Sequence, residues 1–151
     1  MIKSSTLEKA VTGKRVLVDT NIIIYLTDSI SPYEKLSRLL FEIIEKGEVS
    51  AILSVISIAE VMQGPLKKGL MQKALEVKKY LMNFPNIYCQ EITGDVLEHI
   101  GKDLTIQWSQ LRVMDSLILA SGLINSVDLI ISNDIHFKKA LTGDLILAFD
   151  E

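Results

Sequence analysis

Short apolar runs of strand length alternate along the sequence with longer segments that have a helical period. Five runs have the length of buried strands: residues 15–19, 48–53, 86–92, 128–132 and 144–149. Most are apolar at consecutive positions rather than at every second one, which is typical of strands covered on both faces. Because helical segments lie between the runs, the pattern predicts a three-layer α/β/α sandwich with a mainly parallel five-stranded sheet.

Helix-capping residues and helix breakers indicate where the intervening helices begin and end. Ser31, Pro32 and Glu34 have the form of a capping box with proline at the first helical position, and Gly47 is placed to end that helix. The predicted helices cover residues 22–28, 32–46, 54–63 (stopped by Gly64 and Pro65), about 66–83, 93–108, 112–126 and 136–141.

The chain is expected to form one domain over residues 1–151, in which residues 1–14 are a polar N-terminal extension. A length of 151 residues suffices for a hydrophobic core without disulfides or a structural metal. The longest apolar stretches are shorter than the roughly 20 residues that cross a bilayer. The N-terminus lacks the apolar region of a secretory signal, and Cys89 has no partner cysteine. These features predict a soluble cytoplasmic protein with no membrane contact.

Two acidic residues follow predicted strands. Asp19 ends the first strand, and Asp134 lies two residues after the fourth. In an open parallel sheet, ligands bind beyond the carboxyl ends of the strands, so both carboxylates lie where a site is expected. Each acid taken alone is equally well explained as a helix cap or a turn residue.

Two further acids lie in segments that are otherwise apolar. Asp115 belongs to a helix whose faces are nearly all apolar, and Glu60 is surrounded in sequence by valine, isoleucine, alanine and methionine. An uncompensated buried carboxylate costs several kcal/mol, so each acid is expected to pair with a cation, bind a metal or face a cleft. For Asp115, a local ion pair with Arg112 is the alternative.

One shared site explains the four acids more simply than four separate structural roles. Because clustered carboxylates repel one another and raise each other's pKa values, such a site calls for bound cations. Oxygen ligands favour Mg²⁺ or Mn²⁺, and the chain has only two histidines and one cysteine to offer zinc. Carboxylate-bound metal ions suit phosphodiester hydrolysis, since they activate water and stabilise the attacking and leaving oxygens.

The charge distribution bears on nucleic-acid binding. A net charge of −3 argues mildly against a generic nucleic-acid-binding protein, although acids at a metal site are neutralised by the bound cations. Residues 65–80 contain one acid, Glu76, against a set of lysines able to meet phosphates: Lys67, Lys68, Lys73, Lys78 and Lys79. From this stretch alone, a solvated helix face is the preferred interpretation.

Four segments, VLVDTNIIIYL, SVISIAEVMQG, RVMDSLILASGLI and LIISNDIHF, resemble in this order the acidic motifs of the PIN domain family. The resemblance covers nearly the whole chain. In size and single-domain form the chain is similar to the VapC toxins of bacterial and archaeal toxin–antitoxin pairs. It implies a five-stranded parallel sheet between helices. It also implies a metal-dependent ribonuclease in which one or two Mg²⁺ or Mn²⁺ ions are held by the catalytic acids Asp19, Glu60, Asp115 and Asp134.

The resemblance also assigns roles to neighbouring polar residues. Asn21 and Ser132 occupy positions where family members often place small polar residues that hydrogen-bond the acids or the bound water. We interpret Thr20 as a helix cap. The family often has another aspartate where this chain has His136, and we favour a surface residue there over a weak ligand or a phosphate contact.

The expected partners are RNA, an antitoxin whose C-terminal segment lies across the active-site groove, and a second copy in a homodimer. The candidates to contact RNA are Lys67, Lys68 and Arg112. Family toxins commonly begin almost at the first strand, whereas about a dozen residues precede Arg15 here. Two alternatives stay open: a housekeeping RNA-processing nuclease and a catalytically inactive PIN-like binding or scaffold module. The presence of all four acids favours an enzyme.

Overall fold

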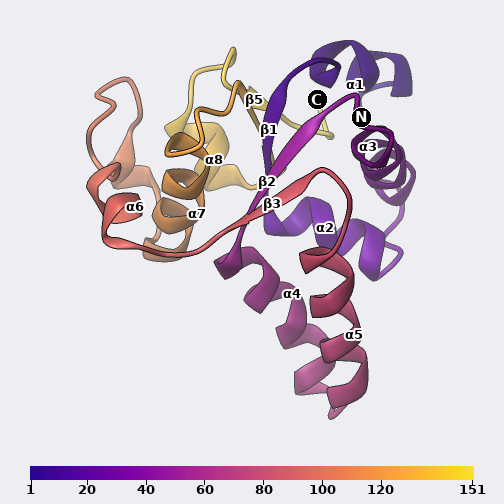
Figure 1. The fold of residues 1–151 in the computed structure, drawn as a ribbon. Coiled ribbons are helices and arrows are strands. Elements are labelled where there is room, and N and C mark those ends of the chain that lie inside the picture. The colour runs from indigo at the N-terminus through magenta and orange to yellow at the C-terminus, as the bar shows by residue number, and fades with distance from the viewer.

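Five parallel strands form the centre of the molecule (Figure 1). The computed structural model describes residues 1–151 and has the strands β1 (Arg15–Val18), β2 (Ser50–Ser54), β3 (Ile87–Gln90), β4 (Leu129–Ile131) and β5 (Ile146–Leu147). Their order in the sheet is β3-β2-β1-β4-β5, and every neighbouring pair is parallel. The predicted sheet is confirmed, with all five strands parallel.

Successive side chains of the central strands enter two separate hydrophobic layers. Val16 and Val18 of β1 belong to the larger buried cluster, whereas Leu17 between them belongs to the second. This alternation follows from the pleat of a strand, which points neighbouring side chains to opposite faces. Strands β2 and β4 alternate in the same way. A sheet with two apolar faces must be covered twice, and the predicted α/β/α sandwich is confirmed.

The helices divide between the two faces of the sheet. The larger cluster is covered by α1 (Ser4–Val11), α2 (Thr20–Thr27) and α3 (Glu34–Glu45). On the other face lie α6 (Gly94–Glu98), the 3-10 helix η1 (Trp108–Gln110), α7 (Val113–Leu123) and α8 (Ile135–Ala140). None of the helices is both long enough and apolar enough to cross a membrane.

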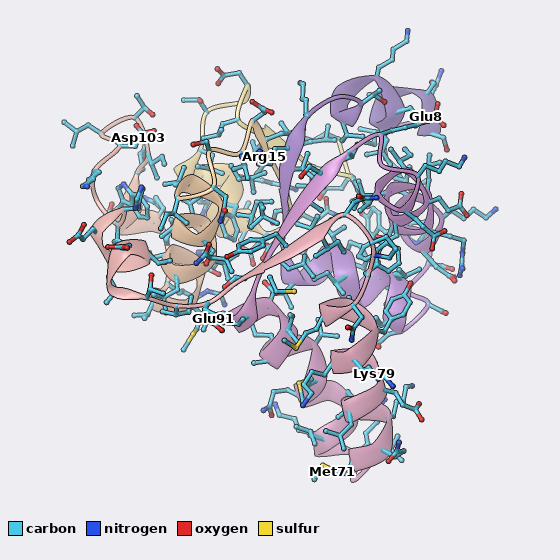
Figure 2. The ribbon with its side chains drawn as sticks, viewed as in Figure 1. Glu8, Arg15, Met71, Lys79, Glu91 and Asp103 are labelled. Atoms are coloured by element: carbon cyan, nitrogen blue, oxygen red, sulfur yellow. The ribbon has the colours of Figure 1, made fainter.

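Helices α4 (Val55–Lys67) and α5 (Met71–Met82) form a hairpin that projects from the body of the molecule (Figure 1). Figure 2 shows Met71 at its tip. The prediction that Gly64 and Pro65 end α4 is wrong, because the helix continues through both residues. Pro65 lies in the last turn, where a proline removes a single helical hydrogen bond. The helix ends instead before Gly69, whose φ of +73° suits a glycine.

The N-terminal residues form part of the core. We expected residues 1–14 to be a polar extension, but Leu7 and Val11 are fully buried in the larger cluster. They lie four residues apart and therefore on one face of α1, which packs against α3. The backbone N–H of Ile2 also donates to the carbonyl of Phe149 at the other end of the chain, at 2.8 Å.

Three other predicted boundaries are wrong. Helix α3 begins at Glu34 with Tyr33 at its N-cap and no side-chain cap, so Ser31 does not form the expected capping box. The helix predicted over residues 93–108 ends at Glu98, since Gly101 takes a φ of +85° in the loop that follows. Strand β5 is two residues long, because only Ile146 and Leu147 pair with β4.

A close approach between α7 and the sheet depends on Gly122. A Cβ atom there would lie 2.9 Å from Leu17 Cδ2, 3.1 Å from Leu17 Cβ and 3.2 Å from Val127 Cγ2. The absence of a side chain lets the end of α7 rest directly on β1. Since Asp115 lies in the first turn of the same helix, this contact helps to set where that carboxylate lies.

Candidate active site

The candidate site lies at the carboxyl ends of β1 and β4, where the strand order reverses direction. Asp19 directly follows β1, and Asp134 lies three residues after β4. Asp115 and Glu60 reach the same place from α7 and α4. All four line one cavity of about 170 Å³, whose other lining residues are Thr20, Asn21, Ile24 and Arg112. The fold therefore brings together the four acids that we singled out from the sequence.

Asp19 is buried and has no basic partner. Its side chain caps α2 by accepting the N–H of Thr20 at 2.8 Å. The hydroxyl of Ser132 donates to Oδ2 at 2.6 Å, and Nδ2 of Asn21 donates to the same oxygen at 3.3 Å. Burial raises the pKa of Asp19 to about 7, and Asp134 and Asp115 add to the increase, although the bonds from Ser132 and Thr20 oppose it.

Asp115 and Asp134 share the guanidinium of Arg112. The Nε atom donates to Asp115 Oδ2 at 2.9 Å, and Nη2 lies 3.3 Å from Asp115 Oδ1 and 3.3 Å from Asp134 Oδ2. The expected local ion pair is present, and its extension to Asp134 was not predicted. The hydrogen bond and charge of Asp115 raise the pKa of Arg112, with further contributions from Asp134 and Glu60.

Helix N-termini supply the other stabilisation of these acids. Asp134 caps α8 by accepting the N–H of His136 at 2.7 Å, and Asp115 accepts the N–H of Arg112 at 3.2 Å in the first turn of α7. Asp19 caps α2 in the same way. The N-terminal ends of three helices therefore face the cavity with the positive ends of their dipoles. Asp19 and Asp134 are therefore helix caps and, at the same time, members of the acidic cluster.

Two expectations about individual residues are wrong. Glu60 is exposed rather than buried, because α4 turns it toward the open mouth of the cavity. Thr20 does not cap α2, since Asp19 holds that position. The hydroxyl of Thr20 instead donates to Glu60 Oε1 at 2.6 Å and lies 3.0 Å from the hydroxyl of Ser57. It fixes the direction of a carboxylate that lacks a cation partner.

A chain of polar side chains supports Asp19 from behind. Ser132, which donates to Asp19, also accepts the N–H of Asp134 at 3.0 Å. Asn21 accepts the N–H of Asn133 at 3.3 Å. Asn133, which sequence analysis missed, accepts the N–H of Phe149 at 2.6 Å and so ties the C-terminal segment to the site. The position of Asn133 next to Asp134, in the loop after β4, is the sequence feature that could have indicated this role.

A second cavity of about 240 Å³ lies between the end of α2 and the α4–α5 hairpin. Its lining includes Asp28 and Ile30 beyond α2, with Gly64, Lys68 and Lys73 from the hairpin. Since Glu60, Gly64 and Lys68 are spaced by four residues, they share one face of α4 and its end, and Lys68 lies about 12 Å from Glu60 along the axis. Lys67 is exposed and lines neither cavity.

His136 is half-buried rather than a free surface residue. Its Nδ1 lies 3.2 Å from the carbonyl of Gln110, and its backbone N–H donates to Asp134. It does not line the cavity. Its imidazole therefore connects α8 to η1.

No three Asp, Glu, His or Cys side chains are gathered tightly enough to form a ready-made metal site. The positions of the partners show why: Arg112 lies between Asp115 and Asp134, and Thr20 holds Glu60. The side-chain atoms of the cavity that could bind a metal ion are nevertheless carboxylate, hydroxyl and amide oxygens, which suit a hard divalent cation. Asp19, buried with no positive neighbour in hydrogen-bonding contact, also fits such an ion.

A comparison with known protein families identifies the family that has this architecture. The PIN domain family model matches residues 16–141. The chain belongs to the PIN domain family. This match includes all four acids and begins just after the N-terminal helix α1. A search of curated proteins gave no match.

Solved structures of toxin–antitoxin systems have the same PIN fold. VapBC2 from Rickettsia felis, bound to a DNA fragment from its promoter, matches with a TM-score of 0.62 and 17% identity, over 89% of this chain and 98% of that chain. A toxin–antitoxin complex from Klebsiella pneumoniae gives 0.59 and 22%, over 87% and 95%. VapC20 from Mycobacterium tuberculosis, a sarcin–ricin loop cleaving toxin, gives 0.58 and 12%, over 86% and 92%.

Proposed function

We propose that this PIN domain is a metal-dependent endoribonuclease that hydrolyses RNA phosphodiester bonds, and that it is the toxin of a VapBC-type pair. One observation carries the proposal. Four acids from distant parts of the chain, Asp19, Glu60, Asp115 and Asp134, converge on one cavity at the carboxyl edge of the sheet. Membership of the PIN family and the likeness to VapBC structures support it.

The four acids would hold one or two divalent cations, Mg²⁺ or Mn²⁺. Such ions, when bound between carboxylates, activate water and stabilise the charge that develops on the phosphate oxygens. The chain's own contribution is to orient the ligands. Ser132 and Asn21 hold the Oδ2 atom of Asp19, and Thr20 holds Glu60, so these residues would position the acids rather than contact the reacting phosphate.

The surface that runs along α4 from the carboxylate cavity would hold the RNA strand. One face of α4 leads from Glu60 at the carboxylate cavity past Gly64, which has no side chain, to Lys68 at the second cavity, which Lys73 also lines. The axial distance of about 12 Å from Glu60 to Lys68 suits a phosphate a short way along the strand from the one being cleaved. Lys68 and Lys73 would therefore bind RNA electrostatically, whereas Lys67 has no place in this path.

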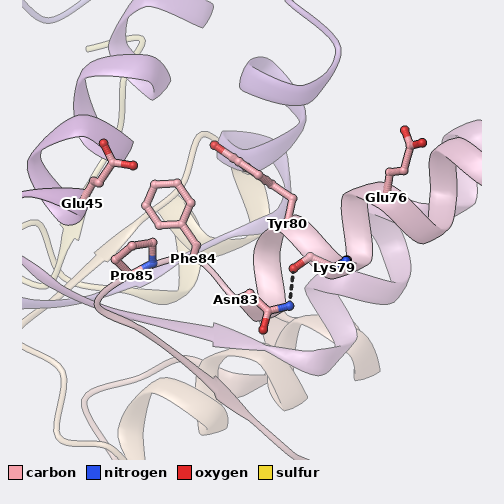
Figure 3. A pocket seen from close by; sticks show the side chains of 7 residues that line it. All are labelled: Glu45, Glu76, Lys79, Tyr80, Asn83, Phe84 and Pro85. Carbon is pink, nitrogen blue, oxygen red and sulfur yellow. Dashed lines mark hydrogen bonds between the residues drawn. The ribbon is translucent and has the colours of Figure 1, made fainter.

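A groove between α3 and α5 is suited to an antitoxin (Figure 3). Tyr80 and Phe84 lie edge to face with ring centroids 5.3 Å apart, and the carboxylates of Glu45 and Glu76 lie at the margins of a cavity of about 440 Å³. Aromatic faces beside carboxylates favour a segment that carries apolar and basic side chains. We propose that the antitoxin lays its C-terminal segment across the active-site groove and a further segment of this kind here, and that two copies of this chain form a homodimer.

The test is cleavage of a mixed pool of transfer and messenger RNA by purified protein with Mg²⁺, with Mn²⁺ and with EDTA. Wild-type protein should cut in either metal and be silent in EDTA, and Asp115→Asn should be silent throughout. Asp95→Asn, which changes an exposed acid in α6 away from the cavity, is the matched control and should cut normally. A folded, antitoxin-free wild-type protein that is silent in both metals would contradict the nuclease and favour a binding module.

A further inference from the structure

Arg112 is the only basic residue that lines the carboxylate cavity. Arg112 also bridges two of the acids, because its guanidinium contacts both Asp115 and Asp134. Asp115 lies in α7 and Asp134 is the N-cap residue of α8, 19 residues further along the sequence. A purely local role for Arg112, as the N-cap residue of α7, would require contact with Asp115 alone.

The geometry of the bridge matches that of a cation bound between two ligands. Three guanidinium hydrogen bonds, at 2.9 and 3.3 Å to Asp115 and at 3.3 Å to Asp134, draw the two carboxylates to one positive centre. The longer contacts are weak for charge-assisted bonds, whose usual length is about 2.7–2.9 Å. The bridge is therefore held loosely at Asp134 and firmly only at Asp115.

Arg112 is free to leave this position. Its side chain is 62% exposed, while the side chain of Asp115 is 7% exposed. The carboxylate is thus fixed in the protein, whereas the guanidinium lies at the surface and can rotate into solvent without burying a charge. Removal of the arginine would leave Asp115 and Asp134 uncompensated beside Asp19, unless another cation replaced it.

We propose that Arg112 is a built-in counter-cation, which holds Asp115 and Asp134 in the metal-free protein and must release at least Asp134 before a divalent ion binds there. It would lower the affinity of the site for metal and keep the free carboxylates from repelling one another. This inference rests on the proposed function, because it concerns the same carboxylates. It adds a competition between two cations, one of which belongs to the chain.

The experiment measures Mn²⁺ binding by calorimetry for the wild type, Arg112→Gln and Arg112→Lys. Arg112→Gln should bind Mn²⁺ about tenfold more tightly, equivalent to about 1.4 kcal/mol, and Arg112→Lys should lie between, since an ammonium cannot bridge two carboxylates with a planar fork. Arg38→Gln removes another exposed arginine, paired with Glu34 away from the site, and should not change the affinity.

A second measurement follows the arginine itself. In the ¹⁵N spectrum of the arginine side chains, the Nε signal of Arg112, assigned from the Arg112→Lys spectrum, should move toward the position of solvent-exposed arginines as Mg²⁺ is added. A wild-type protein that binds Mn²⁺ no more weakly than Arg112→Gln, with an unmoved Arg112 signal, would overturn the inference and leave the proposed nuclease intact. Failure of every variant to bind Mn²⁺ would overturn both.

Discussion

At the scale of single residues, three of the four acids have two roles that favour the same position. Asp19 and Asp134 cap helices, and Asp115 accepts a backbone N–H in the first turn of α7. A helix that begins at the carboxyl edge of a parallel sheet points its N–H groups toward the crevice. A carboxylate that caps such a helix therefore also faces the site, and the structural and functional interpretations agree.

We predict that Asp19→Asn abolishes metal-dependent RNA cleavage and leaves the fold intact. In metal-free buffer at pH 8 the variant should unfold at a higher temperature than the wild type, because it removes a buried charge that lacks a cation partner. Thermal denaturation and the cleavage assay check both parts. Ser132→Ala removes a donor to the same carboxylate without removing its charge, and should reduce cleavage only in part.

Asp19 also predicts how stability depends on pH. Its folded pKa, about 7, lies above its ordinary value of 3.8, so between these values the folded state binds more protons than the unfolded state. In EDTA, unfolding free energy should fall as pH rises from about 4 to 7, by at most about 1.4 kcal/mol per pH unit from this group, and level off above 7. Denaturant titrations of wild type and Asp19→Asn should differ in this slope.

At the scale of elements, the α4–α5 hairpin carries the features that relate to substrate. The continuation of α4 through Pro65 to Lys67 places Lys68 at the second cavity, one helical turn beyond Gly64. Had α4 stopped at Gly64, as predicted, Lys68 would have begun a separate basic helix. The basic stretch is instead divided: Lys68 and Lys73 line the second cavity, and Lys67 and Lys78 are exposed outside it.

The double variant Lys68→Ala and Lys73→Ala should raise the KM for RNA several-fold, leave kcat nearly unchanged and weaken the dependence of KM on salt, since two phosphate contacts are lost. Lys67→Ala with Lys78→Ala makes the same change in net charge and should act weakly. Cleavage kinetics at several salt concentrations distinguish the pairs. Equal effects of both pairs would point to general electrostatic attraction rather than a phosphate path.

Gly122 and Gly64 offer a matched test of helix packing. Gly122→Ala adds a methyl within 3.1 Å of Leu17 Cβ, so it should destabilise the protein by about 1–3 kcal/mol. Gly64→Ala meets nothing within 4 Å and should stabilise α4 by up to about 1 kcal/mol. Chemical denaturation of the two variants measures both values. A stabilising Gly122→Ala would show that α7 can retreat from the sheet.

At the scale of the whole molecule, the N-terminal helix closes the fold. Leu7 and Val11 of α1 complete the larger hydrophobic cluster over α3, and the backbone N–H of Ile2 donates a hydrogen bond to the carbonyl of Phe149. The family match begins at residue 16, so α1 lies outside the matched region and is nevertheless built into the core. The chain termini therefore lie together on the face opposite α7 (Figure 1).

We predict that Leu7→Ala destabilises the protein by about 2–5 kcal/mol, the usual cost of removing a fully buried leucine side chain. Glu8→Ala, an exposed change in the same helix, should alter stability by no more than about 0.5 kcal/mol. Denaturant unfolding compares the two. Equal stability of Leu7→Ala and the wild type would mean that α1 is not docked in solution.

The local pattern of the sequence determined the class of fold and the approximate place of most elements. Consecutive apolar residues such as Val16 to Val18 can be buried only between two layers, and the strands had to alternate with helices. The candidate acids could be named because Asp19 and Asp134 follow strands and Asp115 interrupts an apolar helix. Such features depend on the chemistry of a few neighbouring residues, which the sequence contains.

Only the tertiary structure decided which residues meet. The bridge from Arg112 to Asp134, the bond from Thr20 to Glu60 and the burial of Leu7 each join segments that are remote or unrelated in local pattern. Glu60 shows most clearly what local pattern cannot predict. Its apolar neighbours in sequence predict burial, yet the orientation of α4 leaves its side chain exposed at the cavity. Periodicity sets the faces of an element, whereas packing against distant elements decides what each face touches.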